Sequence, residues 1–238
     1  MSVRRSRDDE LLDVVFTPAN NTSERRRYAY TVLTRLARQD QHEQRWLRKA
    51  LERHVQHTGD DAMAVAMETG SPMPEMIAEV LQNPRMPARQ KLINTLRVQV
   101  PKETINLLEL AVTISQQHVA LLVEKGPRKN FNARMNAQDA YALLASRYEA
   151  TGRFTEALAA RQQALEFAQA LVKSNPGASN RHVLAQAALS LSEIYSKTCH
   201  FREALERARD AESILHILMQ AQPKVYRPAW ARSLKRLV

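Results

Sequence analysis

A pair of aromatic residues recurs at one fixed spacing in the C-terminal half of the chain, and this repeat constrains the fold more than any other sequence feature. Tyr148 and Phe154 stand six residues apart, and Tyr195 and Phe201 repeat the pair 47 residues later. The same offset relates four further pairs: Leu144 and Leu191, Ala157 and Ala204, Leu158 and Leu205, and Ala164 and Ala211. An offset shared by six positions predicts stacked copies of one helical hairpin. Such stacks form long surfaces that bind other chains, and they rarely carry out chemistry.

The composition favours helix along the whole chain. Only five of the 238 residues are glycine, and good helix formers such as Ala, Leu, Arg, Gln and Glu are abundant. The length is sufficient for one large domain or two modest domains with a proper core. We therefore predict an all-α protein.

Large and small side chains alternate in a way that explains why the repeated unit forms a hairpin. Leu144 and Tyr148 lie four residues apart, on one face of the first helix. Gly152 stands at the expected turn, where a residue without a Cβ ends a helix at little cost. Phe154 is expected to pack where the second helix begins, and Ala157 is small where the two helices approach closely. One hairpin cannot bury this surface alone, so it needs neighbours.

At these positions the chain resembles the tetratricopeptide repeat (TPR) family. With Tyr148 placed on the family's mid-helix tyrosine, the first copy matches the signature at Tyr141, Leu144, Ala145, Gly152, Phe154, Ala157 and Ala164. The second copy matches at Leu191, Ser192, Tyr195, Phe201, Ala204 and Ala211. The resemblance is clearest over residues 137–218. It implies an α-α superhelix, a TPR-like solenoid that follows an N-terminal helical segment.

The chain departs from the family pattern at four positions and in its period. Arg161 stands where a large apolar residue is usual, and Cys199 replaces the turn glycine of the second copy. Gln169 and His216 replace the proline that closes a repeat. The period of 46–47 residues exceeds the usual ~34. These longer helices resemble kinesin light chain-like repeats.

Breaks in the hydrophobic pattern predict three regions. Residues 1–22 are expected to be poorly ordered, with Ser23 capping the next helix. Residues 23–100 form an N-terminal helical region, in which one helix is expected to end at Gly59. Residues 101–238 form the TPR-like repeats, which begin with a helix over 103–124. Residues 228–238 are expected to be a partial repeat or a capping helix.

The resemblance implies that the first helix of each hairpin lines a groove that binds a protein or peptide. Transferring the groove-facing positions gives Asp139, Ala142, Ser146 and Glu149 in the first copy, Gln186, Leu189, Glu193, Ser196 and Lys197 in the second, and Arg232, Lys235 and Arg236 in the last. The Lys and Asn residues that form a carboxylate clamp in chaperone-binding relatives are missing. The resemblance thus predicts a non-enzymatic adaptor or scaffold, and an acidic chaperone tail is not the expected partner.

The net charge of +10 supports an alternative function, that of a nucleic-acid-associated regulator. Its excess lies at the two ends of the chain, because residues 224–238 carry five basic residues and no acid. The candidate phosphate contacts near the N-terminus are Arg25, Arg26, Arg27, Arg48 and Lys49. Tyr28, Tyr30 and Trp46 accompany them and could stack on bases. Solvated basic helix faces would produce the same pattern.

A third hypothesis places the protein in a larger assembly or a homo-oligomer. Trp230, Leu234 and Leu237 form an apolar row near the end of the chain, and the sequence stops before a partner helix could follow. An apolar row without a partner is typical of an interface. Residues 228–238 would then dock on another subunit.

Signals of catalysis or of a cofactor are weak, so no enzyme activity, cofactor or metal is expected. His54, His57, Asp60 and Asp61 form the one compact set of candidate metal ligands, but no second cluster completes a site. Cys199 lacks an activating neighbour beyond His200. The N-terminus has no apolar stretch typical of a signal peptide, and no apolar run approaches the ~20 residues that span a bilayer. A cytoplasmic location is therefore predicted.

Overall fold

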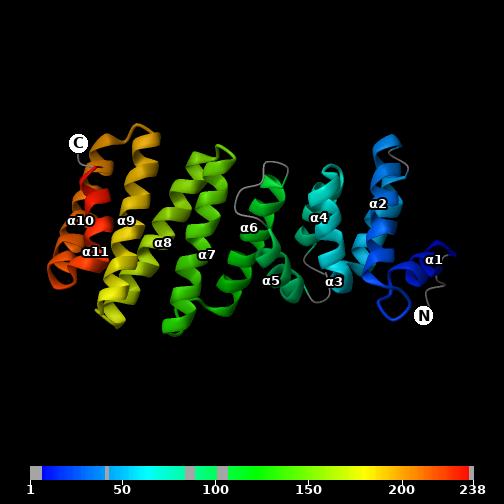
Figure 1. Ribbon diagram of the computed structural model, residues 1–238, viewed down its shortest axis with the longest axis horizontal. Helices are drawn as coiled ribbons and strands as arrows, with labels where there is room; N and C mark the ends of the chain where they lie inside the picture. Colours follow the sequence, from blue (N-terminus) through cyan, green and yellow to red (C-terminus); the bar gives the residue numbers. More distant parts are fainter. Residues whose placement is uncertain (1–6, 41–42, 84–88, 101–106, 236–238) are drawn as a thin grey trace. The chain divides into compact units, whose positions relative to one another are not determined.

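The computed structural model describes residues 7–40, 43–83, 89–100 and 107–235. Within these residues every regular element is an α-helix, which confirms the predicted all-α class (Figure 1). The helices form two compact units, residues 1–118 and residues 119–238. They are α1 (Arg7–Phe16), α2 (Ser23–Gln39), α3 (Gln44–Thr69), α4 (Met73–Gln82), α5 (Arg89–Gln99), α6 (Leu108–Lys125), α7 (Phe131–Ala150), α8 (Phe154–Ser174), α9 (Ala178–Lys197), α10 (Phe201–Ala221) and α11 (Pro223–Leu234).

Helix α1 lies within the segment that was expected to be poorly ordered. A ten-residue helix is marginal by itself in water, so contacts with the rest of the first unit account for it. The Phe16 side chain is buried, with its ring centroid 4.4 Å from that of Tyr30 and 5.8 Å from that of His54. Asp13 accepts hydrogen bonds of 2.9 Å from Arg53. Residues 11–16 are mostly apolar in the sequence, but the residues that contact Phe16 lie on α2 and α3.

The prediction that a helix ends at Gly59 is wrong, because α3 continues to Thr69. Only a kink marks the place, at Thr58 with φ −120° and ψ 17°. Gly59 is buried, and a Cβ at this position would lie 2.6 Å from Leu92 Cδ1 on α5. The glycine therefore allows close packing of α5 and does not end the helix. The helix ends at Thr69, and Gly70, with φ 68°, follows it as the capping residue.

In the second unit, the 47-residue offset extends to the helix ends. Helices α7 and α9 each have 20 residues, helices α8 and α10 each have 21, and the bounds of both pairs differ by 47. The turns also match, with Gly152 at φ 73° and Cys199 at φ 62°. The Arg153 amide donates to the Tyr148 carbonyl at 2.9 Å, and the His200 amide donates to the Tyr195 carbonyl at 2.8 Å. Both turns are thus Schellman motifs, which satisfy carbonyl groups at a helix end.

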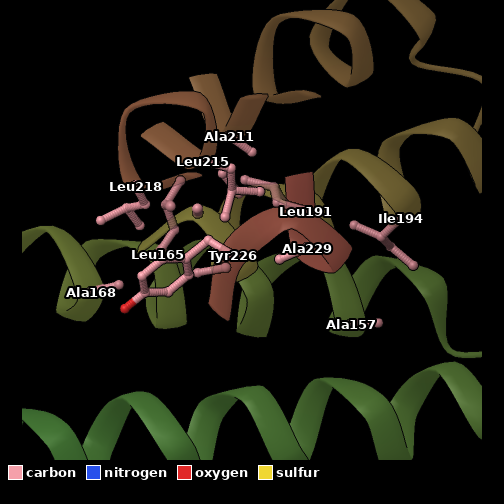
Figure 2. Close-up of a cluster of buried hydrophobic side chains, with 13 residues drawn as sticks. Ala157, Leu165, Ala168, Leu191, Ile194, Ala211, Leu215, Leu218, Tyr226 and Ala229 are labelled. Atoms are coloured by element: carbon pink, nitrogen blue, oxygen red, sulfur yellow. The ribbon is translucent and has the colours of Figure 1, made fainter. Parts of the chain in front are cut away.

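The core of the second unit is contributed by α8 to α11. Small residues such as Ala157, Ala168, Ala185 and Ala211 are fully buried where the helices approach closely. Figure 2 shows this cluster and labels Tyr226 and Ala229 of α11 among its residues. Consecutive helices from α7 to α11 contact one another, which is consistent with a helical repeat.

The repeated phenylalanines are only partly buried. The exposed fraction is 39% for Phe154 and 67% for Phe201. Both residues begin the second helix of a hairpin, directly after the turn. Phe154 was expected to pack where the second helix begins, and its side chain is only partly buried there, while the buried alanines of α8 and α10 lie further along each helix.

Two helices differ in extent from the predictions. Helix α6 begins at Leu108 in place of residue 103, and residues 101–106 lie outside the described part. Its C-terminal half joins the second unit, because Val119 and Leu122 pack against Ala140 and Leu144 of α7. Helix α11 begins at Pro223, five residues before the expected start of the last helix.

Candidate functional site

A pocket of 290 Å³ lies between α9 and α11, with α10 behind it. Gln186, Leu189 and Glu193 fall on one face of α9, because their spacing of three and four residues follows the helical period. Tyr226 and Ala229 are buried in the core and so hold α11 beside this face. The pocket is lined by Gln186, Leu189, Ser190 and Glu193 of α9, Leu215 of α10, and Ala229 and Arg232 of α11.

The structure brings four of the predicted groove residues to this one pocket: Gln186, Leu189, Glu193 and Arg232. Three lining residues were not predicted as groove positions. Ser190 follows Gln186 by one helical turn, so its place on the same face was visible in the periodicity. Leu215 and Ala229 come from the neighbouring helices, and no local pattern indicates that they border the same space.

Arg232 provides positive charge at the α11 side of the pocket. Its Nε donates to the Pro228 carbonyl at 3.4 Å, and in the described part of the chain no carboxylate lies within ion-pairing distance of it. Burial, and then the charge of Arg232, lower the pKa of His182 below its usual value. His182 is therefore neutral at physiological pH and does not add to the positive charge. The Arg232 guanidinium is free to receive an anionic group.

On the α9 side of the pocket, Glu193 is the first of a series of ion pairs that continues through Lys197 to Glu149 of α7. Its carboxylate lies 3.5 Å from Lys197 Nζ, one helical turn further along α9. Lys197 Nζ also lies 2.8 Å from the Glu149 carboxylate of α7. The hydrogen bond to Glu149 is the main reason why the pKa of Lys197 is raised above its usual value. Lys197 is thus held between two carboxylates of its own chain.

Glu149 is a structural ion-pair partner in the fold. Its Oε1 accepts hydrogen bonds from Arg161 Nε at 3.1 Å and from the terminal guanidinium nitrogen at 2.8 Å. Burial would raise the pKa of Glu149, but the hydrogen bonds from Lys197 and Arg161 outweigh it and hold the pKa below its usual value. Arg161 also donates to Ser146 Oγ at 2.9 Å. Two predicted groove residues of α7, Ser146 and Glu149, therefore bind Arg161 and join α7 to α8.

The remaining predicted groove residues do not line the pocket. Asp139 is exposed on α7, and Lys235 is exposed directly after α11. Ala142 and Ser196 lie near the ion-pair network, where the carbonyl of Ala142 accepts from Ser146 and the carbonyl of Ser192 accepts from Ser196. Arg236 lies outside the described residues.

The predicted phosphate contacts of the first unit are mostly engaged within the fold. Buried Asp61 accepts a hydrogen bond from Arg26 Nε at 2.7 Å and one from Arg27 Nε at 3.3 Å. Ser23 also donates to Asp61, while the cap of α2 is Thr22, one residue before the predicted cap. This arrangement neutralises the buried carboxylate and joins α2 to α3.

Of the other predicted phosphate contacts, Arg48 and Lys49 also have acidic partners in the fold. Arg48 lies 2.5 Å from the Glu79 carboxylate, and Lys49 lies 2.7 Å from the Asp9 carboxylate. Among the five predicted residues, only Arg25 has no ion pair within the described part of the chain. Four of the five residues thus have an acidic partner in the same unit, and Arg26 and Arg27 share Asp61.

The candidate metal ligands of the first unit have other partners in the fold. No group of three or more His, Cys, Asp and Glu side chains is placed to hold a metal ion, as far as the described residues extend. His54 pairs with Asp13 at 3.1 Å, and Asp61 is surrounded by arginines. None of the helices in the described ranges is long and apolar enough to cross a membrane.

Comparison of the chain with protein-family models and with curated proteins finds no match. The TPR resemblance therefore rests on the residues of this chain and stays a prediction. Function is inferred from the pocket, its charges and the repeat.

Proposed function

We propose that this protein is a non-enzymatic adaptor or scaffold, which binds a protein partner through the α9–α11 groove of a TPR-like solenoid. The observation that carries the proposal is the pocket between α9 and α11, where four residues selected from the sequence meet. Its 290 Å³ is at the lower end of the ~300–1000 Å³ typical of small-molecule sites. A space of this size suits one or two anchoring side chains of a peptide better than a cofactor.

The lining of the pocket defines the peptide that would fit. Leu189, which is half-buried, would contact a small apolar side chain, and the buried Leu215 and Ala229 form the apolar wall beside it. Gln186 and Ser190 could exchange hydrogen bonds with a peptide backbone. Arg232 would pair with a carboxylate of the peptide, since a guanidinium binds carboxylates with two parallel hydrogen bonds.

Affinity capture with the full-length protein tests this function. The bait would be compared with Leu189→Arg and Arg232→Glu variants in nuclease-treated lysate of the source cells, at about 150 mM salt. We expect a discrete set of proteins that the unmodified bait retains and that both variants lose. Purified candidates would then be titrated against the three baits, with at least a ten-fold weaker affinity expected for each variant.

The matched control is Arg209→Glu, which makes the same charge reversal on the exposed surface of α10. Arg209 does not line the pocket, so binding should be unchanged. Equal binding by Arg232→Glu and the unmodified protein would remove the groove from the proposed function. Retention of nucleic-acid-associated proteins alone, abolished by nuclease, would favour the alternative function at the basic chain ends.

A charge reversal at Glu149 is not a suitable test of the groove. Glu149 is bound to Arg161 and Lys197, so Glu149→Lys would disturb the hairpins themselves. Lost binding in that variant would not separate a contact with the partner from a damaged fold. Leu189 and Arg232 are better probes because both face the pocket.

A further inference from the structure

One face of α2 in the first unit carries an apolar stripe that the described residues leave partly exposed. Tyr28, Val32 and Leu36 follow one another at intervals of four residues, so they lie along one side of the helix. Their exposed fractions are 72%, 36% and 39%. The opposite side of α2, with Tyr30 and Thr34, is buried. The stripe is therefore not the face that joins α2 to its own unit.

Two arginines on the same side of α2 lack acidic partners within the described ranges. Arg25 precedes Tyr28 by three residues, and Arg35 follows Val32 by three, so each adjoins the stripe. Both are exposed, and no carboxylate of the described residues pairs with either. Arg26 and Arg27, in contrast, are both bound to Asp61. Arg38 donates to the backbone carbonyls of Thr69 and Ser71. The fold thus binds three arginines of α2 to its own groups and directs Arg25 and Arg35 to solvent.

The charge of this face decides which occupant it suits. Glu24 also lies on this side of α2, one turn before Tyr28, and together with Arg25 and Arg35 it leaves the face with a net positive charge. A second copy of the chain would bring two such faces together, and like net charges at an interface oppose association. Residues 1–6 carry Arg4 and Arg5 and no acid, so their charge does not complement it either. A nucleic acid could pair with the arginines and stack on Tyr28, but Val32 and Leu36 would offer it only apolar contact. An amphipathic helix with acidic flanks satisfies both the stripe and the two cations.

We propose that the Tyr28–Val32–Leu36 face of α2 docks an acidic amphipathic helix of a partner protein, with carboxylates paired to Arg25 and Arg35. The apolar residues would provide contact area, and the arginines would set orientation and discriminate against neutral or basic helices. This interaction does not depend on the α9–α11 groove, because all of its residues lie in the first unit. The protein would then hold two different partners.

The test uses the full-length protein and a labelled synthetic peptide of about 20 residues, with leucines at every fourth position flanked by glutamates. Two control peptides have the same leucines, one with lysine in place of glutamate and one with the residues in scrambled order. Fluorescence anisotropy would be measured at about 50 and 150 mM salt. We expect binding of the acidic peptide only, with weaker affinity at the higher salt concentration.

Three variants separate the contributions. Arg25→Glu combined with Arg35→Glu should weaken binding of the acidic peptide at least ten-fold and allow the lysine peptide to bind. Val32→Ser combined with Leu36→Ser should weaken binding of the acidic peptide by a similar factor. Arg209→Glu on α10 is the matched control and should bind as the unmodified protein does. Circular dichroism would verify that each variant keeps its helix content.

Four results would overturn the proposal. The first is that the acidic peptide does not bind at either salt concentration, and the second is that it binds the double arginine variant with undiminished affinity. The third is a dimer in sedimentation that the Val32 and Leu36 substitutions abolish, which would assign the face to a second copy. The fourth is a labelled DNA or RNA oligonucleotide that binds more tightly than the peptide and loses affinity in the arginine variant.

Discussion

At the scale of single residues, Arg161 shows how one substitution in a repeat pattern is compensated. It replaces a large apolar residue expected at this position of the first copy, and its side chain is only 14% exposed. A charge with so little solvent is costly unless it is paired. Glu149 supplies the pair, and the second copy has Ala208 and Ser196 at the equivalent positions. The charge and its partner therefore occur together in one copy and are both absent from the other.

Removing the Glu149 carboxylate should destabilise the second unit. Glu149→Ala leaves the Arg161 guanidinium without its acid and Lys197 without its closer carboxylate. We expect a loss of about 2 kcal/mol in the free energy of unfolding, between the values for exposed and for fully buried pairs. Urea denaturation at pH 7 measures it. Glu206→Ala is the control, because its partner Arg202 is 87% exposed and its loss should cost at most a few tenths of a kcal/mol.

The same pair makes this contribution dependent on pH. The pKa of Glu149 is lower in the folded protein than its usual value, so the carboxylate stabilises the fold above the unfolded pKa of about 4.3. The contribution is lost as the pH falls through the lowered pKa of the folded state. The gap in stability between the unmodified protein and Glu149→Ala should therefore be full at pH 7 and shrink below about pH 4. An equal gap at pH 7 and pH 3 would contradict the assignment.

At the scale of the elements, the two hairpins use one turn geometry with two different residues. Gly152 and Cys199 both adopt positive φ, at 73° and 62°. This conformation is easy for glycine and strained for a residue with a Cβ. The Schellman hydrogen bonds of both turns are nevertheless present, because the packed helices on either side hold the backbone in place. The second turn therefore carries strain that the first does not.

Substitutions at the two turn residues should change the free energy of unfolding in opposite directions. Cys199→Gly should raise the free energy of unfolding by about 1 kcal/mol, since it relieves the strain at positive φ. Gly152→Ala should lower it by a similar amount. A Cβ at Gly152 would meet no heavy atom within 4 Å, so the effect reports on the backbone alone. The midpoint of urea denaturation should shift while its slope stays constant. A destabilised Cys199→Gly variant would show that the cysteine side chain contributes contacts that outweigh the strain.

At the scale of the whole molecule, helix α6 spans the boundary between the two compact units. The units meet in sequence between His118 and Val119, within α6. Val119 and Leu122 belong to the cluster of the second unit, together with Ala140, Leu144 and Ala145 of α7. The predicted boundary at residue 100 was placed by Pro101 and stays a prediction. The second unit thus includes a segment that precedes its first full hairpin.

A fragment of residues 119–238 should fold by itself and should be more stable than a fragment of residues 126–238. The longer fragment keeps Val119 and Leu122 over the buried face of α7. Burying two such side chains contributes about 3 kcal/mol, so the shorter fragment should unfold at markedly lower urea concentration. Circular dichroism during urea denaturation measures both. Equal stability of the two fragments, or an unfolded longer fragment, would contradict the division into these units.

The candidate site was predictable only in part. Gln186, Leu189 and Glu193 were predicted from the TPR resemblance, which implies that the first helix of each hairpin carries the groove positions. Leu215 and Ala229 reach the same pocket from other helices. Their place depends on how α10 and α11 pack, which no local pattern encodes. The exposed stripe on α2 was likewise hidden, because Tyr28 and Val32 have the same helical spacing that a buried face would show.

By itself, the sequence determined the all-α class and the places of the turns at Gly152 and Cys199, because helix propensity, side-chain period and turn residues act within a few positions of one another. The tertiary structure alone decided which charges are available to a partner. Arg26 is bound to Asp61, 35 residues away, and Lys197 is bound to Glu149, 48 residues away. Three predicted contact residues, Arg26, Glu149 and Lys197, thus form ion pairs within the fold. Arg25, Arg35 and Arg232 keep their charge for other molecules. The reason is physical: an ion pair depends on distance in space, and the chain brings distant residues together only when its helices pack.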